Sequence, residues 1–169
     1  MPEAKVDTVE QEQEDVVEYL TLSLGQEYFG VDILKVQEIM VWEDVTRIPN
    51  APEYVMGVLN LRGSIVPVYD LRMRLGMEFV EYNEETVVII LRVFGSNGER
   101  NIGIAVDEVS DVLLTSNQSI KDTPDFGEKL DAEFISGIAS VDEKMVTLLS
   151  ADKLQPKEQQ SKVVGEIEE

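Results

Sequence analysis

GVDILKVQEI, at residues 30–39, recurs 73 positions later in the chain as GIAVDEVSDV, at residues 103–112. Both copies begin with a glycine, and both place valine or isoleucine at the seventh and tenth positions. Runs rich in β-branched apolar residues are typical of strands. The match therefore indicates a β-unit that occurs twice in the chain.

Three further matches follow in the same order along the chain: IPNAPEY at 48–54 with IKDTPDF at 120–126, GVL at 57–59 with GIA at 137–139, and IVPV at 65–68 with MVTL at 145–148. The separation grows from 72 to 80 residues after the first of these pairs, which predicts an eight-residue insertion at about 127–134. Because each unit is too small to bury a good hydrophobic core alone, we expect the two to pack together.

The remaining pattern predicts many short strands and little helix. Apolar, β-prone runs bounded by turn residues lie at 18–33 (a hairpin), 64–69, 86–94, 101–106 and 145–149. One short helix is predicted at 71–76, capped by Asp70 and ended by Gly76. This pattern indicates an all-β fold with short helices, arranged as a barrel or a sandwich.

The composition excludes several kinds of chemistry. The chain has 169 residues, a formal net charge of −20, and neither cysteine nor histidine. It therefore cannot form a disulfide, a catalytic thiolate, a histidine-based zinc or haem site, or a Ser-His-Asp triad. The negative charge would repel a phosphate backbone, so nucleic acid is not an expected partner.

Both ends of the chain are polar. Residues 1–16 hold six acidic residues and one lysine, and residues 155–169 hold four acidic residues and two lysines. Without a sustained apolar pattern, both are interpreted as solvated tails that flank a folded region at 17–154. The acidic N-terminus does not resemble a signal peptide, and no apolar run approaches the roughly 20 residues of a spanning helix. A cytoplasmic protein without direct membrane insertion is expected.

Carboxylates beside apolar segments raise the alternative of a carboxylate-dependent hydrolase. The candidates are Glu38, Asp70, Asp107 and Asp111, because paired acids can perform general acid–base catalysis. With 34 acidic residues in the chain, such placements are also expected by coincidence. The sequence has no calcium loop, P-loop or dinucleotide-binding glycine motif. The hydrolase alternative predicts a deep pocket with two convergent acids of shifted pKa.

Other residues are typical of a protein-binding surface. Arg62 lies at a turn between two predicted strands, where it could form an ordinary surface ion pair. It could equally pair with a partner's carboxylate, or with Glu38 across a groove. Trp42 and Tyr54 are of the types most often found as interface anchors, and Gly57 would let another backbone approach closely.

Five strings resemble the CheW family of bacterial chemotaxis coupling proteins: GVDILKVQEI (30–39), VTRIP (45–49), GVLNLRGSIVPVYDL (57–71), GIAVDEVSDV (103–112) and FISG (134–137). The resemblance spans about 20–150, nearly the whole predicted folded region. It implies two five-stranded SH3-like β-barrels packed around a shared core, in agreement with the repeat. It also implies an adaptor that is not an enzyme and needs no metal or other cofactor.

The same resemblance implies partners. CheW-like proteins bind the cytoplasmic tips of chemoreceptors and the regulatory domain of the histidine kinase CheA, and other CheW copies can join them in rings. This predicts a cytoplasmic protein associated with membrane-bound receptor arrays. An alternative is a CheW paralogue that serves another chemosensory pathway, such as surface motility.

The resemblance also implies site residues, carried over position by position. The receptor-binding groove would involve Val36, Glu38, Ile39, Gly57, Arg62, Gly103 and Val112. The resemblance implies Lys121 and Phe126 as kinase-binding residues, and the repeat mate of their loop, 45–54, adds Arg47 and Tyr54. One departure from the family pattern is the apolar run Met40-Val41-Trp42, which bears on partner specificity.

Overall fold

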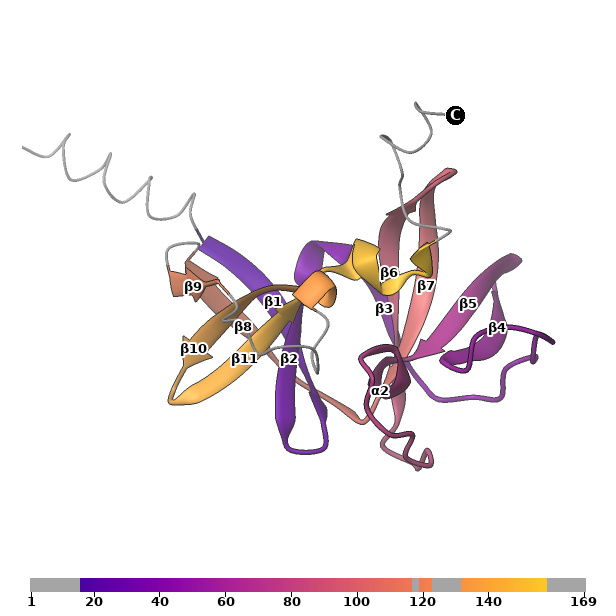
Figure 1. Cartoon of the computed structure of the whole chain (residues 1–169), viewed down its shortest axis with the longest axis horizontal. Helices are drawn as coiled ribbons and strands as arrows, with labels where there is room; N and C mark the ends of the chain where they lie inside the picture. Colours follow the sequence, from indigo (N-terminus) through magenta and orange to yellow (C-terminus); the bar gives the residue numbers. More distant parts are fainter. Residues whose placement is uncertain (1–15, 117–118, 123–131, 158–169) are drawn as a thin grey trace, which may run out of the picture.

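The computed structural model describes residues 16–116, 119–122 and 132–157, and these form two β-sheets joined by short helices (Figure 1). The prediction of an all-β fold with short helices is confirmed. The elements, in chain order, are β1 (Val16–Leu24), β2 (Glu27–Asp32), η1 (Ile33–Lys35), β3 (Val36–Val41), β4 (Val55–Leu61), β5 (Ser64–Asp70), α2 (Leu71–Arg74), β6 (Val87–Gly95), β7 (Gly98–Val106), β8 (Glu108–Ser116), β9 (Ile120–Lys121), η3 (Ala132–Phe134), β10 (Ile135–Val141), β11 (Lys144–Leu149) and η4 (Ala151–Leu154).

The two sheets do not coincide with the two sequence repeats. The five-stranded sheet has the order β3-β6-β7-β5-β4, and the six-stranded sheet has the order β8-β1-β2-β11-β10-β9. The five-stranded sheet takes the β6–β7 hairpin from the second repeat and its other strands from the first. The six-stranded sheet takes the β1–β2 hairpin from the first repeat and its other strands from the second. The units that we expected to pack side by side are interleaved, so neither sheet can form without residues from both halves of the chain.

The parallel strand pairs show the repeat directly. In the six-stranded sheet β11 runs parallel to β2, with Leu148 opposite Gly30. In the five-stranded sheet β5 runs parallel to β7, with Val68 opposite Gly103. Gly30 matches Gly103 in the repeat, and Val68 matches Leu148. The parallel pair therefore has the same register in both sheets.

The hydrophobic core lies mainly between the sheets. Its largest cluster contains fully buried side chains from both, such as Leu22 and Val31 from the six-stranded sheet and Leu91 and Ile104 from the five-stranded sheet. Each sheet also has a smaller cluster of its own, formed around Val68 and Ile90 or around Ala139 and Leu148. The expectation of a shared core is met by the largest cluster.

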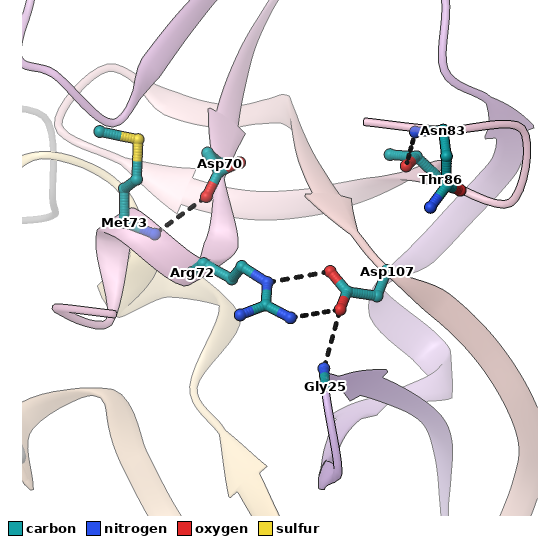
Figure 2. A network of polar contacts seen from close by, with 7 residues as sticks. All are labelled: Gly25, Asp70, Arg72, Met73, Asn83, Thr86 and Asp107. Atoms are coloured by element: carbon teal, nitrogen blue, oxygen red, sulfur yellow. Dashed lines mark hydrogen bonds and ion pairs between the residues drawn. The ribbon is translucent and has the colours of Figure 1, made fainter. Parts of the chain in front are cut away.

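The chain crosses from the five-stranded to the six-stranded sheet at Asp107, the single residue between β7 and β8. Its carboxylate accepts hydrogen bonds from Arg72 Nε at 3.0 Å and from Arg72 Nη2 at 2.5 Å (Figure 2). It also accepts one from the backbone nitrogen of Gly25, in the β1–β2 turn, at 2.8 Å. One carboxylate thus connects α2, the crossing point and a hairpin of the other sheet.

Local signals in the sequence mark several element ends correctly. The Asp70 side chain accepts a hydrogen bond from Met73 N at 2.9 Å and so caps α2, as predicted. The helix reaches only Arg74, and Gly76 follows with a φ of 85°. The predicted turn at 95–98 joins β6 to β7.

The folded region extends past the boundary that the sequence predicted at residue 154. Gln155 is fully buried, and its side chain donates to the carbonyl oxygens of Phe94 at 2.8 Å and Asp152 at 3.0 Å. The predicted insertion at 127–134 and most of both predicted tails lie outside the described residues. No helix among the described residues is long and apolar enough to cross a membrane.

Candidate protein-binding surface

Glu38 and Arg62 meet at the surface of the five-stranded sheet. Arg62 Nη2 donates to Glu38 Oε1 at 2.7 Å, which joins the β4–β5 turn to the edge strand β3. Arg62 has a φ of 50°, and the turn is held by a hydrogen bond from Gly63 N to Asn60 Oδ1 at 2.9 Å. The hydrogen bond to Glu38 raises the pKa of Arg62, which is charged in any case. The pair presents fixed, accessible charge.

Apolar side chains lie on β3 beside this ion pair. Ile39 and Val41 point outward, with 44% and 65% of their surface exposed. Val36 is half-buried and packs against the main core cluster. Strand alternation therefore divides the predicted set: Ile39 is available to a partner, while Val36 supports the strand from within.

Val112 is the repeat counterpart of Ile39, on the edge strand β8 of the six-stranded sheet. It is 51% exposed, and Leu114 on the same strand is 61% exposed. Val112 also lines a groove of about 350 Å³ with Tyr28 and Lys144. Likewise Val109 packs against the main core, as its counterpart Val36 does. Each sheet thus offers two exposed apolar positions at matching places on an edge strand, Ile39 and Val41 on β3 and Val112 and Leu114 on β8.

Gly57 and Gly103 lie inside the protein, although the resemblance placed them in a receptor groove. Gly57 has a φ of 147°, and a Cβ there would lie 2.3 Å from the carbonyl oxygen of Thr46. A Cβ on Gly103 would lie 2.9 Å from Cγ1 of Val88. Both glycines allow neighbouring segments to pack closely.

The expected kinase-binding residues Arg47 and Tyr54 flank one loop and have different environments. Arg47 is exposed and lines a hollow of about 480 Å³ with the apolar side chains of Met56 and Phe79. Tyr54 is half-buried, with its ring centroid 5.8 Å from that of Tyr69. It holds the loop against the sheet. This division could not be read from the sequence, which only marks both as plausible anchors.

The other expected kinase-binding position is partly described. Lys121 lies on β9, the short outer strand of the six-stranded sheet, and is exposed. Phe126 lies outside the described residues. β9 is the counterpart of the loop that holds Arg47, because the repeat matches 48–54 with 120–126.

Comparison with known proteins assigns the chain and its fold to a family. The sequence-family model of the CheW-like domain matches residues 18–159. The chain belongs to the CheW family. A chemotaxis protein CheW from Klebsiella aerogenes is 44% identical over 146 residues, 86% of each chain. One from Rhizobium meliloti is 36% identical over 142 residues, 84% of this chain and 89% of that one.

A solved structure and a differently named relative add to this assignment. The crystal structure of the scaffolding protein TtCheW from Thermoanaerobacter tengcongensis has a TM-score of 0.75 and 31% identity, and the match covers 85% of this chain and 91% of that one. Protein FrzA of Myxococcus xanthus is 28% identical over 140 residues, 81% of this chain and 84% of that protein. Proteins similar to this chain therefore do not all carry the name CheW.

Asp70 and Asp107, two of the four carboxylates suggested for a hydrolase, have structural partners in this CheW-family fold. Asp70 accepts from Met73 N and from Tyr82 Oη, and Asp107 is held by Arg72. The hydrogen bonds from Arg72 keep the pKa of Asp107 below its usual value, whereas a general acid needs a raised one. Among the described residues, no cluster of three acidic side chains could hold a metal ion.

Sequence reasoning missed several exposed apolar residues of this CheW-family chain. Leu34, in η1 between the sheets, is 83% exposed, and Met145 on β11 is 64% exposed. The apolar run Met40-Val41-Trp42, which departs from the family pattern, exposes less apolar surface than its sequence suggests. Met40 and Trp42 pack against the inner cluster of the five-stranded sheet, so only Val41 faces outward.

Proposed function

We propose that this protein is a non-catalytic scaffold of bacterial chemotaxis that couples the cytoplasmic tips of chemoreceptors to the histidine kinase CheA. Membership of the CheW family carries this proposal, since the relatives named above are chemotaxis and scaffolding proteins. The exposed edge-strand residues and the Glu38–Arg62 pair support it physically, because they provide a surface without requiring any reaction chemistry.

The receptor tip is an amphipathic helical hairpin, and such helices bind through apolar residues at helical spacing. Ile39 and Val112 are accessible apolar contacts on the two edge strands, β3 and β8. The Glu38–Arg62 pair offers one acceptor and several donors, which would fix the register of the helix by charge-assisted hydrogen bonds. In this mechanism Gly57 and Gly103 maintain the strand packing behind the contact surface.

The kinase would bind at the loops of the sheets, away from the receptor contact. The exposed Lys121 lies in the stretch 120–126, which the repeat matches with 48–54, the residues directly after Arg47. Two similar but unequal surfaces would let one molecule contact two neighbours in a closed ring. The protein would then be cytoplasmic and held at membrane-bound receptor arrays through its partners.

Reconstitution tests this function. Receptor tip fragments, CheA and this protein are combined, and CheA autophosphorylation is measured with each component left out in turn. The proposal predicts receptor-dependent kinase control only when this protein is present. Control that is unchanged without the protein would contradict it.

A CheW paralogue that serves another chemosensory pathway is a second candidate, since one relative carries a name other than CheW. Both candidates use the same surfaces and differ in partner. Deletion of the gene, followed by separate assays of swimming chemotaxis and surface motility, separates them: loss of swimming chemotaxis alone supports the first candidate, and loss of surface motility alone supports the second.

A further inference from the structure

β5 and β7 are paired over only part of their length. Their parallel ladder begins where Val68 meets Gly103 and continues toward the ends of both strands. Within the described strands, residues 64–67 of β5 and 98–102 of β7 have ladder partners only on their outer sides, from β4 and β6. Figure 1 shows β4 and β5 leaning away from β6 and β7 in this region. Two strand edges therefore face each other without a strand between them.

A groove of about 590 Å³ lies between these edges. Residues 64–67 line one side and residues 99–101 the other, and Arg92 joins them from β6. Ile65 is 65% exposed at its rim. Unpaired edges of this kind bind extended segments by strand addition, in which backbone hydrogen bonds supply affinity and side chains supply specificity.

Two arginines in the groove have no carboxylate partner among the described residues. Arg92 donates to Gln37 Oε1 and Arg100 Nη2 donates to the Tyr69 hydroxyl, each at 3.0 Å. The Nε atom of Arg100 is buried and has no hydrogen-bond partner within the described residues. The ion pairs found among those residues involve neither arginine. The two arginines outnumber the one carboxylate that lines the groove, Glu99, so in a chain of net charge −20 this is a local positive site suited to a carboxylate-bearing segment.

We propose that the groove binds the chain's own C-terminal segment, residues 158–169, as an extended strand between β5 and β7. This segment, EQQSKVVGEIEE, contains four glutamates and one lysine. It ends in Glu-Ile-Glu-Glu, at residues 166–169. The first three of these alternate between charged and apolar, and alternation with a period of two suits a strand. Its carboxylates would pair with Arg92 and Arg100, and Ile167 would cover Ile65.

The path of the chain makes this occupant accessible to the groove. Gln155 is anchored to the carbonyl oxygen of Phe94, two residues from Arg92 on β6. Twelve residues follow Lys157 and, fully extended, can span about 40 Å. Because the segment is covalently attached, its effective concentration at the groove would be high, so modest contacts would suffice. The CheW-like domain match ends at residue 159, so the groove lies inside the matched region and most of the proposed occupant lies beyond it.

Spin labelling of the full chain tests the proposal. The chain has no cysteine, so Gly165→Cys provides a unique attachment site for a nitroxide label. The proposal predicts loss of amide NMR signal intensity around Ile65 and Glu99, and recovery of that intensity in high salt, because surface ion pairs are screened. A label at Gln11→Cys, in the other acidic terminal segment, is the control and should leave these amides unaffected.

Variants then test the arginine contact. Arg92→Glu should restore the signal intensity, whereas Arg47→Glu, at an exposed arginine elsewhere, should not. Adding Glu166→Lys and Glu168→Lys to Arg92→Glu should recreate the loss. Full signal intensity in the labelled parent chain, or a loss that persists in Arg92→Glu, would overturn the site. A loss seen only between a labelled and an isotope-labelled molecule in a mixture would overturn the intramolecular occupant.

Discussion

Arg72 and Asp107 form a two-point ion pair at the residue where the chain passes from one sheet to the other. The Arg72 side chain is only 14% exposed, and the same carboxylate also accepts from Gly25 N in the other sheet. Because the strands are interleaved, the relative placement of the sheets depends on their two crossing points. The pair therefore fixes the arrangement that positions Ile39 and Val112 on the molecule.

Removing the charge of Asp107 should destabilise the fold. Asp107→Asn keeps the shape of the side chain but cannot match both Arg72 donors, so we expect a loss of roughly 1–3 kcal/mol in the free energy of unfolding. Urea unfolding at neutral pH measures it. A double-mutant cycle with Arg72→Ala should show coupling between the two positions. Additive effects would contradict the structural role.

The same pair predicts a dependence on pH. Arg72 lowers the pKa of the Asp107 carboxyl in the folded protein, so its stabilisation is complete above the unfolded pKa of about 3.9. The stabilisation is lost as the pH falls through the lower folded pKa. Asp107→Asn should therefore lose less stability than the parent chain over this acidic range. Equal acid sensitivity of the two proteins would contradict the assignment.

Two glycines with positive φ should respond very differently to alanine. At Gly57 a Cβ would collide with the backbone of Thr46, so Gly57→Ala should cost about 2–4 kcal/mol. Gly63 has a φ of 91°, but no atom of the described residues beyond its chain neighbours lies within 4 Å of a Cβ there. Gly63→Ala should cost only about 1 kcal/mol, from backbone strain. Thermal unfolding compares them, and similar losses would contradict the packing argument.

The Glu38–Arg62 pair should matter for binding more than for stability. Arg62 has 73% of its side-chain surface exposed, so Arg62→Ala should leave the melting temperature within about 2 °C of the parent. Receptor-fragment affinity should fall roughly tenfold, as expected for a charged interface anchor. If Arg62→Ala lowers the melting temperature strongly and binds normally, the residue is structural instead.

The exposed apolar counterparts should act together on receptor binding. Ile39→Asp and Val112→Asp should each weaken binding of the receptor fragment by roughly tenfold or more, because each places a charge in an apolar contact. Val80→Asp is the matched control, since Val80 is 47% exposed in the loop between α2 and β6. An effect of the control as large as that of the other two would point to a general charge effect.

Much of the fold could be predicted because its signals are local or repeated. The alternation in 18–33, the turn at 95–98 and the cap at Asp70 each depend on a few neighbouring residues. The interleaving of the repeats could not be predicted in this way. It depends on pairings such as Gly30 with Leu148, which are far apart in the chain and leave no local pattern.

The candidate site was predicted less completely than the fold. Sequence marks Val36 and Ile39 alike, and only the strand geometry shows that Val36 faces the core and Ile39 faces solvent. The sequence places Gly57 and Gly103 in a groove but does not show their close packing against Thr46 and Val88. The Glu38–Arg62 pair was anticipated as one of two alternatives and is present in the structure.

Calorimetric titration tests the central claim most directly. The protein is titrated separately into the regulatory domain of CheA and into a receptor tip fragment. Then each titration is repeated with Arg62→Ala and with Arg47→Ala. The account predicts saturable one-to-one binding to both partners, with Arg62→Ala weakening only the receptor and Arg47→Ala only the kinase. A correctly folded protein that binds neither partner would contradict the proposed function and leave only the fold.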